Sequence, residues 1–86
     1  MNINDLIAII KKKLHNQINI ESIKIEDKSF LHTNHVGNQE GKFHLKISLI
    51  SSELKTMNRI ESNKKIYKSL EKEMKNYIHS IQILIS

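Results

Sequence analysis

Residues 29–44 read SFLHTNHVGNQEGKFH, and this stretch separates two segments in which apolar and polar residues alternate. Alternation with a period of two predicts half-buried β-strands over 20–27 and over 43–49. The two strands most simply pair antiparallel across the connection. At about 15 residues the connection is far longer than a hairpin loop, and loops of that length in compact domains are functional or mobile.

Two further segments carry the three- and four-residue spacing of amphipathic helices. Asn2 and Asp5 resemble a capping box ahead of a helix expected over 4–16. The polar stretch after Ser51 is rich in capping residues and predicts a short turn or helical piece. A longer helix is expected over 59–75, where apolar residues recur at helical spacing.

The final segment, YIHSIQILIS, alternates again and predicts a third strand entered through His79. The expected order is therefore helix, strand, strand, short helix, helix, strand. Strands with one polar face and helices with one apolar stripe bury their surfaces when the helices cover one face of a small mixed sheet. We predict an α+β fold in which the sheet face opposite the helices is exposed to solvent. With 86 residues, the chain is expected to form a single domain over 1–86.

The composition limits the classes of protein to consider. The chain has no cysteine or proline, so it must fold on packing alone, without disulfides. No apolar run is long enough to cross a membrane, and the first positive charges follow the apolar stretch, the reverse of a secretory signal. We expect a soluble, cytoplasmic protein with no membrane partner.

The net charge is +5, from 14 Lys and Arg against 9 Asp and Glu. Such a surface could attract nucleic acid or an acidic partner, although solubility explains the same charge. Lys64, Lys65 and Lys68 lie mainly off the apolar stripe of the helix expected over 59–75 and are candidate DNA contacts. Part of this charge is ordinary helix-surface decoration, because Glu61 stands four residues before Lys65.

The sequence holds no nucleophile paired with a base and no CxxC motif, so we do not expect an enzyme. Gly37 and Gly41 do not form a phosphate loop, since no Lys-Ser or Lys-Thr pair follows at the needed spacing. They more plausibly permit turns with positive backbone dihedrals. The region 56–59 contains no glycine, which argues against RNA binding through a GXXG turn.

Two longer runs resemble the BolA family: DKSFLHTNHVGNQEGKFHLKISLIS over 27–51 and IYKSLEKEMKNYIHSIQI over 66–83. The chain can be laid on that family without a gap over about residues 22–85. The most telling pieces are the serine and histidine that begin the loop, a His-Leu pair where the family favours His-Phe, and the helix that leads into an Ile-His pair: Ser29, His32, His44, Leu45, Tyr67, Leu70, Ile78 and His79.

The chain departs from the family at two places. Leu54-Lys55-Thr56 stands where the family usually has a Phe-x-Gly turn, and Ser62-Asn63-Lys64 replaces an Arg-His-Arg stretch. The second departure argues against the helical nucleic-acid contact described for the family. The absence of cysteine groups the chain with members that carry histidine in the loop.

The resemblance implies a class II KH-like fold and a partnership with a monothiol glutaredoxin, the two proteins sharing a 2Fe-2S cluster. It also implies a role in iron-sulfur cluster handling and iron regulation. Some bacterial members are described as transcriptional regulators that affect cell shape under stress.

Imidazole is a good ligand for iron, but one chain that supplies two histidines cannot complete the ligands of a 2Fe-2S cluster. Thiolates from a partner are needed. The resemblance implies that a glutaredoxin gives its cysteine and a bound glutathione sulfur, while this chain gives His79 and one loop histidine. Among these His32 ranks first, ahead of His44 and His35. By spacing alone, His79 also fits a histidine that caps the preceding helix.

The sequence therefore predicts a non-enzymatic adaptor, monomeric when free, that forms a heterodimer with a monothiol glutaredoxin and co-ligates the cluster through His79 and His32. The rival is a DNA-binding transcriptional regulator that uses Lys64, Lys65 and Lys68 on the long helix.

Overall fold

The strand β2 (Phe43–Ile50) lies at the centre of a three-stranded sheet and pairs with a neighbour on each side. The computed structural model describes residues 1–29 and 42–86. In it, β1 (Ser22–Asp27) runs antiparallel to β2 and β3 (Ile78–Ile85) runs parallel to it. The predicted mixed sheet and the predicted antiparallel pairing of the first two strands are confirmed.

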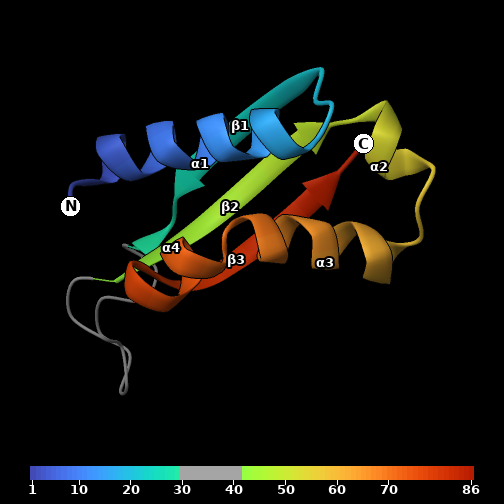
Figure 1. Cartoon of the computed structure of the whole chain (residues 1–86). Coiled ribbons are helices and arrows are strands. Elements are labelled where there is room, and N and C mark those ends of the chain that lie inside the picture. Colours follow the sequence, from blue (N-terminus) through green and yellow to red (C-terminus); the bar gives the residue numbers. More distant parts are fainter. Residues whose placement is uncertain (30–41) are drawn as a thin grey trace.

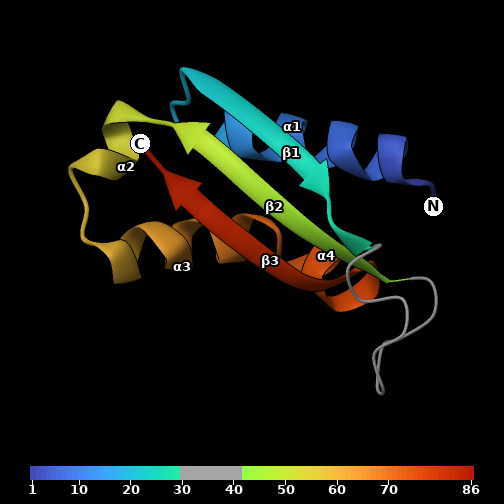
Figure 2. The same ribbon diagram turned by 180° about the vertical axis from the view of Figure 1, so that it is seen from behind.

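The helices cover one face of this sheet. They are α1 (Ile3–Gln17), α2 (Ser52–Lys55), α3 (Arg59–Ser69) and α4 (Glu71–Asn76). Figure 1 shows α1, α3 and α4 in front of the strands, and Figure 2, from behind, shows the strands with no helix in front of them. None of the helices in the described ranges has the length and hydropathy needed to cross a bilayer.

The core lies between β2 and the helix layer. Alternate residues of a strand point to the same face, and Leu45, Ile47 and Leu49 are each at most 3% exposed. The helix layer meets them with fully buried side chains spaced four residues apart along each segment: Leu6, Ile10, Leu14, Ile66 and Leu70. The apolar faces predicted from strand alternation and from helical spacing therefore pack against each other in one layer.

Side-chain caps set the helix starts. The Asn2 side chain accepts a hydrogen bond from the Asp5 amide at 2.8 Å, which confirms the predicted cap. Ser51 caps α2 through the Leu54 amide at 3.1 Å. The first helix extends one residue beyond the prediction at each end. The first strand begins at Ser22, two residues later than predicted.

The helix predicted over 59–75 is interrupted at Leu70, where the backbone leaves helical geometry at φ −108° and ψ 17°. The Ser69 hydroxyl donates to the Lys65 carbonyl at 2.9 Å, a contact that bends helices. The Leu70 amide is shared between the carbonyls of Ile66 and Tyr67. Leu70 remains fully buried, and the chain continues as α4.

The α4 segment presents a buried carboxylate to the first helix. Glu73 is 4% exposed, and its Oε2 pairs with Lys13 Nζ at 2.6 Å. Its other oxygen, Oε1, is buried and has no hydrogen-bond partner among the described residues. A buried carboxylate without its counter-ion is costly, so Lys13 is needed to hold α4 against α1.

Lys13→Ala should therefore lower the free energy of unfolding by about 1–2 kcal/mol, which is less than the cost of about 3–5 kcal/mol for a fully buried pair because Lys13 is partly exposed. The control Lys12→Ala, at an exposed position on the same helix, should stay within about 0.5 kcal/mol. Urea denaturation measures both. Adding Glu73→Gln to Lys13→Ala should restore part of the loss, and a further loss of similar size would contradict this account.

Candidate functional site

The end of β1 and the start of β2 are tied together by a short chain of hydrogen bonds. Asp27 Oδ1 accepts from the Ser29 amide at 2.9 Å and from the Ser29 hydroxyl at 2.5 Å. The same hydroxyl accepts from the His44 amide at 3.0 Å, and the His44 carbonyl accepts from the Lys28 amide at 2.7 Å. Ser29 and His44 therefore hold the residues that follow β1 next to the start of β2.

The pairing of β2 with β3 contains one extra residue at this same end of the sheet. Phe43 stands opposite Ile78, but His44 stands opposite Ser80, so His79 is the additional residue of a β-bulge. Bulges are rare between parallel strands, and they re-aim side chains and often lie beside functional sites. Here the bulge brings the imidazole of His79 next to that of His44.

The two imidazole rings lie 4.8 Å apart between centroids and are tilted by 51°. His44 is only 5% exposed, and its Nδ1 lies 2.8 Å from the Ser80 hydroxyl, which orients the ring. His79 is exposed. The structure thus pairs an accessible imidazole with a buried one that is held in place.

These positions answer several of the predictions about histidine. His79 lies within β3 and Tyr77 is the C-cap of α4, so the helix-capping alternative for His79 is wrong. The sequence placed His44 on the polar side of its strand without indicating that the ring would be buried. His32 and His35 lie outside the described residues, as do Gly37 and Gly41. Within 1–29 and 42–86, no three metal-binding side chains gather at one point.

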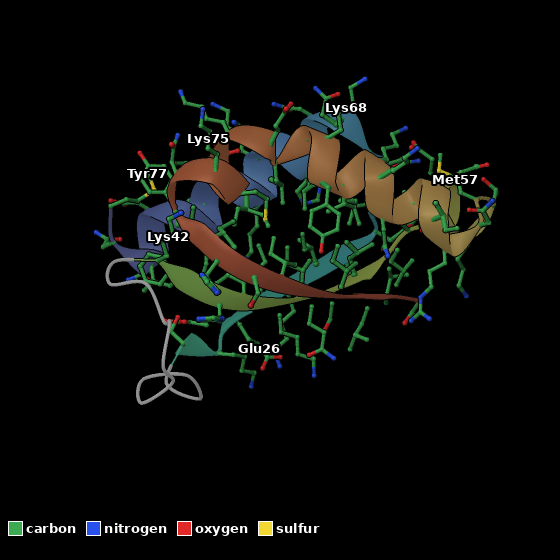
Figure 3. The ribbon with its side chains drawn as sticks, turned by 90° about the horizontal axis from the view of Figure 1, so that it is seen from below. Glu26, Lys42, Met57, Lys68, Lys75 and Tyr77 are labelled. Atoms are coloured by element: carbon green, nitrogen blue, oxygen red, sulfur yellow. The ribbon has the colours of Figure 1, made fainter. Side chains whose placement is uncertain are left out.

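The uncovered sheet face beside the histidines carries charges of both signs. Glu26 pairs with Lys28 at 2.8 Å and with Lys24 at 3.5 Å, and it stands opposite Lys46 in the strand register. The hydrogen bond from Lys28 is the main reason that the pKa of Glu26 lies below its ordinary value. Figure 3 shows Glu26 beneath the sheet, on the side away from the helices. This mixed charge does not by itself select an anionic partner.

The candidate DNA-contacting lysines of α3 are in different surroundings. Lys65 does not pair with Glu61 as its spacing suggested, but with Glu53 at 2.6 Å, and this hydrogen bond lowers the pKa of Glu53. Lys64 and Lys68 are exposed. A hollow of about 590 Å³ between α1 and α3 is lined by Lys65, Lys68 and Lys13, and the sequence did not indicate that Lys13 would lie next to the lysines of α3.

Comparison with known proteins finds the family model described as BolA-like protein over residues 14–86. A relative from Haemophilus influenzae, named DNA-binding transcriptional regulator BolA, is 25% identical over 75 residues, which cover 87% of this chain and 70% of the relative. The family resemblance predicted from the sequence is confirmed.

Two solved structures show the same fold. The BolA domain of SufE1 from Arabidopsis thaliana superposes with a TM-score of 0.79 at 20% identity, covering 100% of this chain and 93% of that chain. BolA1 from Arabidopsis thaliana gives a TM-score of 0.76 at 20% identity, covering 91% and 86%. The class II KH-like label stays a prediction.

The two adjacent histidines should respond differently to truncation. His44→Ala removes a buried ring and leaves the Ser80 hydroxyl without that contact, so the free energy of unfolding should fall by about 1–3 kcal/mol. His79→Ala removes an exposed ring and should change it by less than about 0.5 kcal/mol. Thermal and urea denaturation measure both values. Equal losses for the two variants would show that His79 is as structural as His44.

Proposed function

Because its residues 14–86 show that this chain belongs to the family of BolA-like proteins, we propose that it is a non-enzymatic adaptor that pairs with a monothiol glutaredoxin and shares a 2Fe-2S cluster with it. The observation that carries the proposal is the exposed ring of His79, set by the β-bulge beside the buried ring of His44. An exposed imidazole on an otherwise ordered strand is available to a metal that another protein holds.

The residues of this chain fit half of such a site. The chain has five histidines and no cysteine, so it offers nitrogen ligands and no thiolate. A 2Fe-2S cluster takes four protein ligands, and the remaining two must come from a partner that supplies sulfur, such as a glutaredoxin with its bound glutathione. When bound, the cluster would supply one-electron chemistry at a potential raised by histidine ligation.

The proposal requires a second histidine ligand from this chain, and three histidines are candidates for it. The family resemblance favours His32, and His35 is a weaker candidate from the same segment. The structure favours His44 by its nearness to His79, but its burial and its contact with Ser80 suit an orienting role better. We therefore retain His32 as the partner of His79. Ser29 would act by holding the start of the loop against β2.

Mixing this protein with a cluster-loaded monothiol glutaredoxin should change the visible absorption and circular dichroism of the cluster, because imidazole replaces a sulfur ligand. His79→Ala should abolish the change while leaving the fold intact. The matched control is His15→Ala, which removes another exposed histidine at the end of α1 and should behave as the wild type.

The outcome separates the ligand choices as well. Loss of the spectral change in His32→Ala, with His44→Ala retaining it in the fraction that stays folded, supports the choice made here. An unchanged spectrum on mixing, or the same change with His79→Ala, would refute the proposed adaptor role.

A second candidate function is sequence-independent contact with duplex DNA. It is favoured by the hollow in which Lys13, Lys65 and Lys68 meet, and by the name of the relative from Haemophilus influenzae. Two of these lysines are engaged by carboxylates, since Lys13 pairs with Glu73 and Lys65 with Glu53. That engagement reduces the positive charge offered to phosphates, which makes this the weaker candidate.

This second function predicts duplex binding that weakens steeply with added salt, as measured by fluorescence anisotropy across a salt series. Lys68→Glu, inside the hollow, should weaken binding more than Lys64→Glu, which does not line it. Lys24→Glu places the same charge change on β1, away from the hollow, and should have little effect. Absence of binding near physiological salt would remove this candidate.

A further inference from the structure

The strand β3 has an edge that no other strand of residues 1–29 and 42–86 covers. The strand order β1-β2-β3 gives β3 a single neighbour, and its sequence IHSIQILI contains no proline, lysine, arginine or carboxylate. Proteins usually protect edge strands with charge, proline, bulges or a covering element, because an open edge pairs readily with other chains. Along most of β3, the sequence supplies none of these protections.

The direction of the backbone groups shows which part of the edge is open. The Ser86 amide donates to the Leu49 carbonyl at 2.9 Å and the Ser86 carbonyl accepts from the Ser51 amide at 3.3 Å, so Ser86 faces the β2 side. Strand residues alternate in this respect, so Ile83 and Ile85 direct their N–H and C=O groups away from β2.

The helix α3 covers the edge nearer the start of the strand. There the Ile81 carbonyl accepts a long hydrogen bond, 3.5 Å, from the Tyr67 hydroxyl of α3. No partner for the outward backbone groups of Ile83 and Ile85 is found among the described residues, so the uncovered part of the edge is the end of β3. Figures 1 and 2 show α3 alongside this edge, in the helix layer.

A groove of about 590 Å³ lies against the same part of the edge. Its apolar lining comes from Leu54, Met57, Ile83, Leu84 and Ile85. Figure 3 shows Met57 at the end of the helix layer toward which β3 runs. An open strand edge and an apolar groove thus lie next to one another, which is the arrangement that binds extended peptides.

The polar lining of the groove selects the charge of its occupant. Lys55 and Arg59 line it and are exposed, and neither belongs to an ion pair found among the described residues. No aspartate or glutamate of the described residues lines the groove. The groove therefore has a mixed lining, with Ser62, Asn63 and Ser86 among its polar residues, and its charged side chains in the described residues are both cationic.

We propose that this groove binds an extended acidic peptide segment of another protein, which adds a strand to β3 at Ile83 and Ile85. Main-chain groups of the peptide would pair with the open edge, and alternate apolar side chains would pack on Leu54 and Met57. Its carboxylates would face Arg59 and Lys55. The groove lies about 20 Å along the strand from His79, so this binding does not depend on the proposed cluster.

The same features disfavour two other occupants. A second copy of the chain also carries a net charge of +5, and a two-fold pairing of the β3 edges would bring the two Arg59 side chains into one interface. Single-stranded nucleic acid is usually held by stacking on aromatic side chains, and none of those described lines this groove.

The test uses a fluorescein-labelled peptide of sequence EVEIEVE with blocked ends. It should bind saturably by anisotropy and shift the backbone amide NMR signals of Ile83 and Ile85. Two matched peptides serve as controls: KVKIKVK, of opposite charge, and EVEIEVE with alternate backbone amides N-methylated. Both should lose binding, the first through charge and the second through the missing ladder hydrogen bonds.

Arg59→Glu should weaken binding of EVEIEVE about tenfold or more. This variant keeps the fold, because a carboxylate suits the first turn of α3. Lys24→Glu makes the same charge change on β1 and should leave the affinity unchanged. The proposal is overturned by absence of saturable binding or by insensitivity to Arg59→Glu or N-methylation. It is also overturned if oligo(dT) binds the protein more tightly than EVEIEVE does. A dimer detected by sedimentation and lost on substitution of Arg59 or Ile83 would overturn it as well.

Discussion

The double pairing of β2 is the constraint on which the other elements depend. Its inward residues Leu45, Ile47 and Leu49 are buried, and a slip of one residue in either ladder would turn them toward solvent. Both neighbouring strands are therefore held in one register, and the helices must cover the face that β2 leaves apolar.

The regular elements could be predicted from the sequence because their signals are local. Alternation over 43–49 and helical spacing over 4–16 each reflect one buried face, and the Asn2 cap acts within a single turn. The interruption at Leu70 was missed because no glycine or proline marks it. The one local sign was Ser69, whose hydroxyl bonds to the carbonyl of the preceding turn. Such a serine bends some helices and not others, according to what the next turn must contact.

The sequence predicted which residues belong to the candidate site, but not how they are arranged in space. The sequence and its family resemblance singled out His79 and His44, but the bulge that joins them arises from backbone pairing between segments far apart in the chain. The burial of His44 likewise depends on contacts with distant residues such as Ser80 and Ser29. Lys13 was missed as a neighbour of Lys65 because one lies on α1 and the other on α3, and helix spacing says nothing about contacts between helices.

The two ends of β3 have different physical roles because different elements meet them. At its start, the bulge sets the exposed ring of His79 beside the buried ring of His44, where another protein can reach an imidazole without disturbing the core. At its end, the outward backbone groups of Ile83 and Ile85 have no hydrogen-bond partner among the described residues, whereas the Tyr67 hydroxyl of α3 reaches the edge at Ile81. We propose that the first surface offers a nitrogen donor to a metal and that the second offers main-chain hydrogen bonds to a peptide. Because His79 and Arg59 are both exposed, the two surfaces can be altered separately by side-chain substitution.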